Sequence, residues 1–318
     1  MGRIISKNWL RLLFIFLMAF SITLIGGVAA KTLLHSSNSE QNTLTDKGNI
    51  PASSDNISEN NTPATPTFIN LQPTIDAWAS TMPGNAGVMI YDLDNQKIAA
   101  EYNADEIFNM ASVYKLFFVY DGYQQIDAGN DDSSAVVTCD RSKGGNLSLG
   151  TCLDLMVRES YNPCADPIRA DEERYMRVEN FINSTGLTQT SSAGLYSSAR
   201  DITTFMQILW QHQGIDEENW NKLLDSMLNQ PITTYDWRQG LPAGFSVAKV
   251  YDKVGWNYTG SYWSIYNDVA FVEFPEQNRH YIIVVLTEGI RSHTPTPVIE
   301  LGQAIEQAVL TTDINTAQ

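Results

Sequence analysis

The sequence predicts an α+β fold, with an antiparallel sheet formed from both ends of one domain and a helical lobe inserted between them. A hairpin pattern comes early (GVMIYDL and KIAAEYN, within residues 87–103), and helical spacing of apolar residues fills the middle. Three segments rich in β-branched and aromatic residues follow near the C-terminus. Strands first and last, with helices between, indicate α+β.

A membrane segment is expected before this domain. Residues 1–11 carry Arg3, Lys7 and Arg11, and residues 12–30 form an uncharged apolar run. A run of this length can span a bilayer as a signal anchor, but Val28-Ala29-Ala30 also suits cleavage of a signal peptide. In either case the basic residues place the start in the cytoplasm and the rest outside, anchored to the membrane or secreted.

Residues 31–67 are rich in Ser, Asn, Thr and Pro and nearly free of large apolar side chains. Such a segment buries too little apolar surface to offset its ordering entropy, so we expect a disordered tether. The folded domain is then expected over residues 68–312, with a short tail at 313–318.

The elements of the domain are expected in the following order. A helical pattern over residues 69–82 leads into the hairpin, which turns at residues 94–96. Helices are predicted over residues 112–125, 153–159, 175–184 and 199–211. Strands are predicted within residues 245–256, 262–274 and 280–289, and a last helix over 297–310. We expect a site between the sheet and the helical lobe.

The composition excludes several classes of function. The chain has 318 residues, with 20 Lys and Arg against 36 Asp and Glu, a formal net charge of −16. A phosphate backbone would be repelled, so no nucleic-acid partner is expected. The histidines are scattered and do not show the spacing of metal ligands, so no metal is expected. They are His35, His212, His280 and His293. We also expect no other cofactor, and we expect a monomer.

Cys139, Cys152 and Cys164 lie in one region, and an extracytoplasmic location allows one disulfide with one thiol left over. Sequence does not choose among the three pairings. We favour Cys139 with Cys152, because the polar, glycine-containing loop between them would gain order from a crosslink.

Three short motifs could carry chemistry. In ASVYKLF, Ser112 lies one helical turn before Lys115, whose apolar neighbours favour a lowered pKa and therefore a neutral amine that can act as a base. Asn109 can cap this helix and would place Ser112 in its first turn. Each motif alone is weak, and Lys115 alone reads as a surface lysine of an amphipathic helix.

The second motif, Ser160-Tyr161-Asn162, precedes a proline and is expected in a turn, and the third, Lys253-Val254-Gly255, ends a strand-like segment. Together, S-x-x-K, S-x-N and K-x-G resemble the motifs of the active-site serine family that contains class A β-lactamases and penicillin-binding proteins, a set that is also a standard example of catalytic motifs. The resemblance extends from about Gly87 through the last helix.

The resemblance implies a role for each motif residue. Ser112 would be the acylated nucleophile, Lys115 its base, and Ser160 the group that passes a proton to the leaving nitrogen. Asn162 would hold the substrate amide, and Lys253 would attract the substrate carboxylate. Trp256 directly follows Gly255, the last residue of the third motif. The backbone N–H groups of Ser112 and Trp256 would together form the oxyanion hole.

The sequence departs from the family pattern in two places. Val254 lacks the hydroxyl usual at the centre of the third motif, unless Ser246, Thr259 or Ser261 replaces it. The loop glutamate that activates water in class A enzymes is not recognisable. Glutamates that follow the second motif are interpreted as solvated helix surface. They are Glu172, Glu173 and Glu179.

The leading hypothesis is therefore an extracytoplasmic serine hydrolase acylated by β-lactams or by D-alanyl peptides of the cell wall, with doubtful deacylation. A slowly deacylating, peptidase-like penicillin-binding protein and a non-catalytic binding module that retains the fold are the alternatives.

Overall fold

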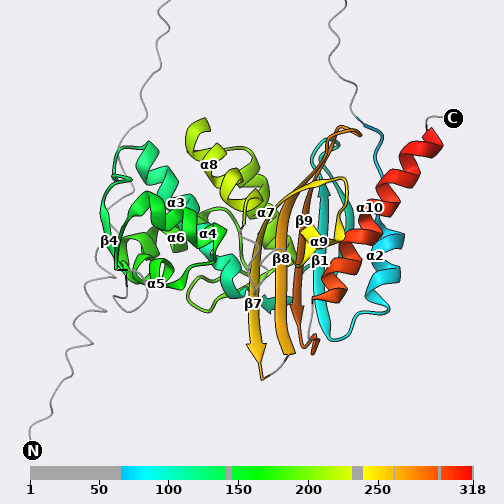
Figure 1. The fold of residues 1–318 in the computed structure, drawn as a ribbon, viewed down its shortest axis with the longest axis horizontal. Helices are drawn as coiled ribbons and strands as arrows, with labels where there is room; N and C mark the ends of the chain where they lie inside the picture. The colour runs from blue at the N-terminus through cyan, green and yellow to red at the C-terminus, as the bar shows by residue number, and fades with distance from the viewer. Residues whose placement is uncertain (1–65, 140–144, 231–238, 261, 293–294, 317–318) are drawn as a thin grey trace, which may run out of the picture. The chain divides into compact units, whose positions relative to one another are not determined.

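The computed structural model describes residues 66–139, 145–230, 239–260, 262–292 and 295–316 (Figure 1). These residues belong to one compact unit, Thr62–Gln318. The expected membrane segment and nearly all of the tether fall outside the described residues. Among the helices that are described, none combines the length and apolar character needed to cross a bilayer.

One five-stranded antiparallel sheet forms the centre of this unit. Its strands, in spatial order, are β2 (Lys97–Tyr102), β1 (Asn85–Asp92), β9 (Arg279–Glu288), β8 (Tyr262–Phe274) and β7 (Lys249–Thr259). β1 pairs directly with β9, with Met89 opposite Val284, so the two ends of the domain meet in the middle of the sheet. This confirms the predicted α+β arrangement.

Two helices cover one face of the sheet, α2 (Gln72–Ala79) and α10 (Thr296–Thr316), seen beside each other in Figure 1. Their apolar side chains share a buried cluster with the sheet, and Trp78 Nε1 donates to Pro297 O at 2.7 Å. Because the helices come from the two ends of the domain, this contact ties the ends together.

The helical lobe covers the other face and holds a second buried cluster. It includes the 3₁₀ helix η1 (Ala111–Tyr114). Its main helices are α3 (Lys115–Asp127), α4 (Leu149–Arg158), α5 (Asn162–Ala170), α6 (Glu172–Ser184), α7 (Ala199–Trp210) and α8 (Glu217–Leu228). Its paired short strands are β3 (Ile107–Asn109) with β6 (Tyr196–Ser198), and β4 (Val136–Thr138) with β5 (Asn146–Ser148). The short helix α9 (Leu241–Gly244) precedes β7.

The predicted helices are present, and capping explains their true starts. Ser148, Asp171 and Ser198 accept hydrogen bonds from backbone N–H groups at the beginnings of α4, α6 and α7, so α4 and α6 begin earlier than their apolar spacing indicates. Helix α5 was missed because its two prolines resemble a turn; Pro163 occupies the first turn of the helix, where no N–H is needed. Helix α8 was also missed.

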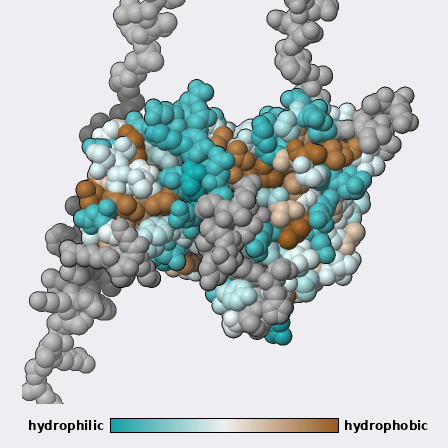
Figure 2. Space-filling view, viewed as in Figure 1, coloured by the Kyte–Doolittle hydropathy of each residue, from teal (hydrophilic) through white to brown (hydrophobic). Residues whose placement is uncertain are grey.

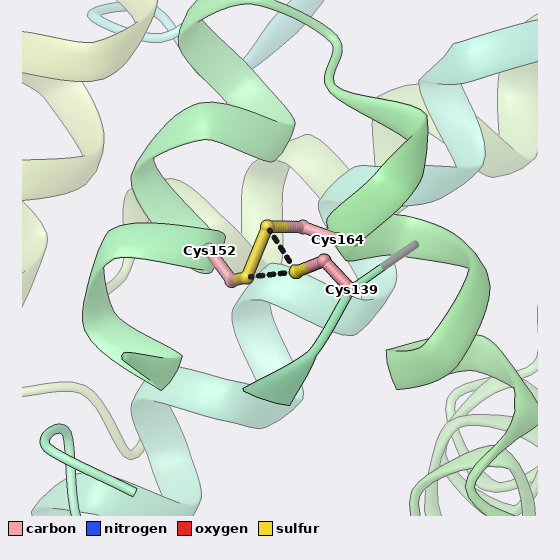
Figure 3. Close-up of side chains that lie close together, drawn as sticks. All are labelled: Cys139, Cys152 and Cys164. Atoms are coloured by element: carbon pink, nitrogen blue, oxygen red, sulfur yellow. Dashed lines mark hydrogen bonds between the residues drawn. A yellow bond between two sulfur atoms is a disulfide. The ribbon is translucent and has the colours of Figure 1, made fainter. Parts of the chain in front are cut away.

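The favoured cysteine pairing was wrong. The disulfide joins Cys152 of α4 to Cys164 of α5, with Cα atoms 5.3 Å apart, and Cys139 is a buried free thiol (Figure 3). Helices α4 and α5 pack against each other on either side of the Ser160 turn, which brings their cysteines face to face. The polar composition of the segment between Cys139 and Cys152 was thus a poorer guide to the pairing than the packing of α4 on α5.

Hydrophilic residues gather over α8 on the face shown in Figure 2. Beside them a groove of about 620 Å³ lies between α3, α4 and α8, and its lining includes the Arg158–Asp154 ion pair. None of the predicted site residues lines this groove.

Candidate active site

Ser112 lies on η1, immediately after a backbone kink. Ala111 has φ of +46°, a left-handed conformation that is unfavourable for a residue with a side chain. Asn109 Oδ1 accepts from the Ala111 N–H at 2.7 Å, and Met110 N donates to Leu195 O at 2.8 Å. Asn109 is therefore not the helix cap that was predicted: Met110 occupies the N-cap position and no side-chain capping bond is made, while Asn109 binds the N–H of the first helical residue. Ser112 lies in the first turn as expected, and this turn is 3₁₀ rather than α.

The side chain of Lys115 is fully buried beneath Ser112. Its Nζ donates to Ser112 Oγ at 2.9 Å, to Asn162 Oδ1 at 2.6 Å, and to the carbonyl and hydroxyl oxygens of Ser160 at 2.7 and 3.2 Å. Burial lowers the pKa of Lys115 to about 8, and the negative charge of Asp166 opposes that shift. The amine is thus suited to exchange a proton with Ser112 near neutral pH.

Ser160 lies in the turn between α4 and α5 and has a left-handed backbone, with φ of +51°. Its hydroxyl joins the two lysines, because it also accepts from Lys253 Nζ at 2.9 Å. Asn162 is the first residue of α5. The predicted turn is therefore present, and it brings the second motif to the first.

The chain on both sides of this strained turn is fixed. Two residues upstream, Arg158 pairs with Asp154 at 2.7 Å and with Asp225 of α8 at 2.8 Å, and it donates to Asn229 O. Across the turn, the disulfide joins α4 to α5. Unfavourable backbone conformations persist where the surroundings hold them in this way.

Lys253 reaches the site from β7 and is fully buried. Its Nζ donates to Ser160 Oγ and, at 2.8 Å, to Val254 O. Burial holds the pKa of Lys253 well below its ordinary value and repulsion from Lys115 adds to this, whereas Asp252 and Asp268 act in the opposite direction. The hydrogen bond to Ser160 Oγ therefore links Lys253, in the third motif, to the second motif.

Gly255 allows β7 to pass close to η1. A Cβ at this position would clash with the carbonyl oxygen of Met110 and lie 3.0 Å from Ser112 N. Only glycine permits this approach. Trp256 follows directly, so its backbone is carried along the same strand beside η1, while its side chain packs against the cluster on the α2–α10 face.

Sequence reasoning missed Asn267, which fixes η1 to the sheet. This fully buried β8 side chain donates to Asn109 O at 2.7 Å and accepts from Thr287 N at 2.8 Å. It thereby holds the segment leading to Ser112 against β8 and β9. The sequence did contain a signal for this role, because Asn267 lies within a long, largely apolar strand segment. A buried amide there needs hydrogen-bond partners.

Sequence reasoning also missed Asp166, whose charge acts on Lys115. It lies one turn after Asn162 on α5 and is exposed. Of the glutamates expected on the helix surface, Glu172 and Glu173 are exposed as predicted. Glu179 is not: it is half-buried, and its carboxylate accepts from the backbone N–H and the hydroxyl of Ser192.

Val254 is fully buried in the apolar cluster on the α2–α10 face of the sheet. The structure thus gives its side chain a packing role, and a hydroxyl here would face apolar side chains. Ser246 is bound by Glu306, which accepts from its hydroxyl at 2.7 Å, so it is not placed as a substitute. The side chains of Thr259 and Ser261 lie outside the described part of the chain.

The segment between α6 and α7, residues 185–198, passes beside the start of η1, which carries Ser112, through the β3–β6 pairing and the Met110–Leu195 hydrogen bond. Its sequence, TGLTQTSSAGLYSS, contains no Asp or Glu. The three motifs thus meet as a serine hydroxyl, a second hydroxyl and two buried amines, an arrangement that can move a proton to and from Ser112.

A family model described as the β-lactamase enzyme family matches residues 70–309. No curated protein sequence matches the chain. Solved structures with the same fold include a β-lactamase from Chitinophaga pinensis, 19% identical over 74% of this chain and 98% of its own, with a TM-score of 0.64.

Two further structures show the same similarity. The protein described as PBP-A is 20% identical over 76% of this chain and 96% of its own, with a TM-score of 0.64. A class A β-lactamase from Bacteroides cellulosilyticus is 16% identical over 75% of this chain and 96% of its own, with a TM-score of 0.63. At these identities, the neighbours show the fold.

Proposed function

The chain belongs to the β-lactamase enzyme family, and from that premise we propose that it is an extracytoplasmic serine enzyme that is acylated on Ser112 by β-lactams or by D-alanyl peptides. One observation carries this proposal: Lys115 Nζ, with a pKa lowered to about 8, lies 2.9 Å from Ser112 Oγ and contacts the second motif through Ser160 and Asn162. An S-x-x-K spacing alone would not predict that the lysine also contacts Ser160 and Asn162.

Acylation begins when the neutral amine of Lys115 takes the proton from Ser112 Oγ as that oxygen attacks the substrate carbonyl. At pH 7, a pKa of about 8 leaves roughly a tenth of the lysine neutral. The backbone N–H groups of Ser112 and Trp256 stabilise the developing oxyanion, an arrangement supported by the close approach of β7 at Gly255.

The leaving nitrogen then needs a proton. Ser160 Oγ supplies it and is resupplied from Lys115, 3.2 Å away, while Lys253 holds the hydroxyl in place from the other side. A bound substrate carboxylate favours the protonated form of Lys253, whose pKa is otherwise lowered by burial. Because its side chain is buried, this lysine acts on the substrate through the Ser160 hydroxyl and not by direct contact. Asn162 Oδ1 faces Lys115, which orients its amide for the substrate.

We infer that the acyl-enzyme is long-lived. The segment beside the nucleophile, residues 185–198, carries no carboxylate to activate water. One structure of a PBP-A mutant, a protein with the same fold, is described as an acyl-enzyme complex with penicillin G. Asp166 supports a second candidate, a β-lactamase with turnover, because its carboxylate acts electrostatically on Lys115 from the neighbouring helix.

The test is intact mass spectrometry of the full chain mixed with benzylpenicillin, followed over time, with Ser112→Ala as control. We expect a single adduct, absent in the control, that persists for minutes or longer. An adduct that decays within seconds as hydrolysed penicillin accumulates would favour the β-lactamase candidate. If benzylpenicillin and an acyl-D-alanyl-D-alanine peptide both gave no adduct or hydrolysis, the proposal would be wrong.

A further inference from the structure

We propose that Cys139, Cys152 and Cys164 form a thiol–disulfide exchange site in which Cys139 can replace either partner of the disulfide. In the second part of this proposal, the two cysteines that are joined determine the geometry of the turn that carries Ser160 and Asn162. The first part stands on the cysteines alone. The second part rests on the proposed function, because it concerns acylation of Ser112.

The three sulfurs form one buried cluster. Cys139 Sγ lies 3.8 Å from Cys152 Sγ and 3.7 Å from Cys164 Sγ, and all three residues are at most 2% exposed. Figure 3 shows Cys139 beside the disulfide, with contacts to both of its sulfurs. With two sulfurs already bonded to each other, the cluster offers a single thiol to a metal, so exchange is the chemistry that the arrangement favours.

Exchange balances without an outside oxidant. The Cys139 thiolate attacks Cys164 Sγ, a Cys139–Cys164 bond forms, and the Cys152–Cys164 bond breaks with its electron pair leaving on Cys152, which then takes up a proton. Attack on Cys152 Sγ gives the other pairing and releases Cys164. Because Cys139 is buried and uncatalysed disulfide rearrangement is slow, we expect exchange over minutes to hours.

Each pairing ties a different pair of elements together. The present disulfide joins α4 to α5, and the loop that it closes, residues 152–164, contains the strained Ser160 and the start of α5. Cys139 directly follows β4, outside these helices. A bond from Cys139 to either partner therefore removes the α4–α5 crosslink and leaves the Ser160 turn held from the upstream side by Arg158.

Single substitutions, each made in the full chain and incubated with oxidised glutathione as the oxidant, trap each alternative pairing. Cys152→Ala leaves Cys139 with Cys164, Cys164→Ala leaves Cys139 with Cys152, and Cys139→Ala preserves the present disulfide. After an acid quench, denaturation and alkylation, we expect no alkylated thiol in any of the three variants, and peptide mapping should find the stated bonds. Two alkylated thiols in both trapped variants would overturn the exchange site.

The unsubstituted chain provides a test that does not depend on how the variants fold. Protein held at pH 8.5 for hours, then quenched with acid and mapped, should accumulate disulfides that contain Cys139, whereas protein held at pH 5 should not. If only the Cys152–Cys164 bond is found at every time point, exchange does not occur and the first part of the proposal is wrong.

The positioning role is tested by the rate of acylation. We expect Cys164→Ala to be acylated by benzylpenicillin about tenfold more slowly than Cys139→Ala, with the loss in the rate constant rather than in initial binding. Leu301→Ala, in the distant α2–α10 cluster, serves as a control of lowered stability and should keep the full rate. An unchanged rate in Cys164→Ala would overturn the positioning role. If even the unsubstituted chain is not acylated, the proposed function fails, while cysteine mapping still decides the exchange.

Discussion

The two faces of the sheet use the same strands for different purposes. On β7 and β8, Lys253, Gly255 and Asn267 face the helical lobe and form or support the site. The alternating neighbours Val254 and Tyr266 face α2 and α10 and belong to an apolar cluster. One face of the sheet thus supports the candidate site and the other carries apolar packing, so substitutions on the two faces should separate activity from stability.

The largest effect is expected on the lobe side, from Lys115→Met. Removing the base should slow acylation by about 10²–10⁴-fold, because Ser112 then has no amine to take its proton. Stopped-flow or mass-based acylation rates measure this. Lys222→Met, an exposed lysine on α8, is the matched control and should leave the rate unchanged. An acylation rate in Lys115→Met equal to that of the unsubstituted chain would assign the base elsewhere.

Gly255→Ala should have the next largest effect. The added Cβ meets the Met110 carbonyl and crowds Ser112 N, so β7 and η1 must move apart and acylation should fall by about 10²-fold. Gly150→Ala adds a Cβ with only ordinary contacts, the nearest at 3.4 Å, and serves as the control. Equal acylation rates for the two variants would show that the close approach of β7 is not needed.

On the opposite face, Val254→Thr should change stability and leave acylation unaltered. The new hydroxyl enters an apolar cluster, which should lower the free energy of unfolding by about 1–3 kcal/mol. Urea denaturation and acylation rates, measured on the same preparation, test both parts. Faster acylation or tighter binding of benzylpenicillin would instead place this side chain on the substrate side.

The smallest effect is expected from Asp166→Asn. Acylation should rise with pH toward a plateau above about pH 8, as Lys115 loses its proton. Asp166 raises the pKa of Lys115, so its neutralisation should lower that pKa, move the rise to lower pH, and increase the rate at pH 7 by about twofold. Glu172→Gln, on the exposed surface of α6, is the control. A shift to higher pH would contradict the sign of this interaction.

Local patterns predicted most of the fold and the motif residues. The β8 segment, residues 262–274, was predicted with its observed bounds because β-branched and aromatic residues fill it. Contacts between distant segments were not predictable in the same way. Asn267 meets Asn109 from the far end of the domain, and the disulfide depends on how α4 packs on α5. Only the folded chain shows these contacts.

The pairing of β1 with β9 also has a consequence for folding order. Roughly 200 residues of chain separate these neighbouring strands, and such distant pairings form late because closing a long loop costs entropy before any contact forms. The helical lobe can assemble from nearby segments, but η1 meets β7 only when the C-terminal strands arrive. A chain still emerging from the ribosome therefore carries Ser112 without the strand that completes the candidate site, and the three motifs can meet only after the C-terminal strands have been made.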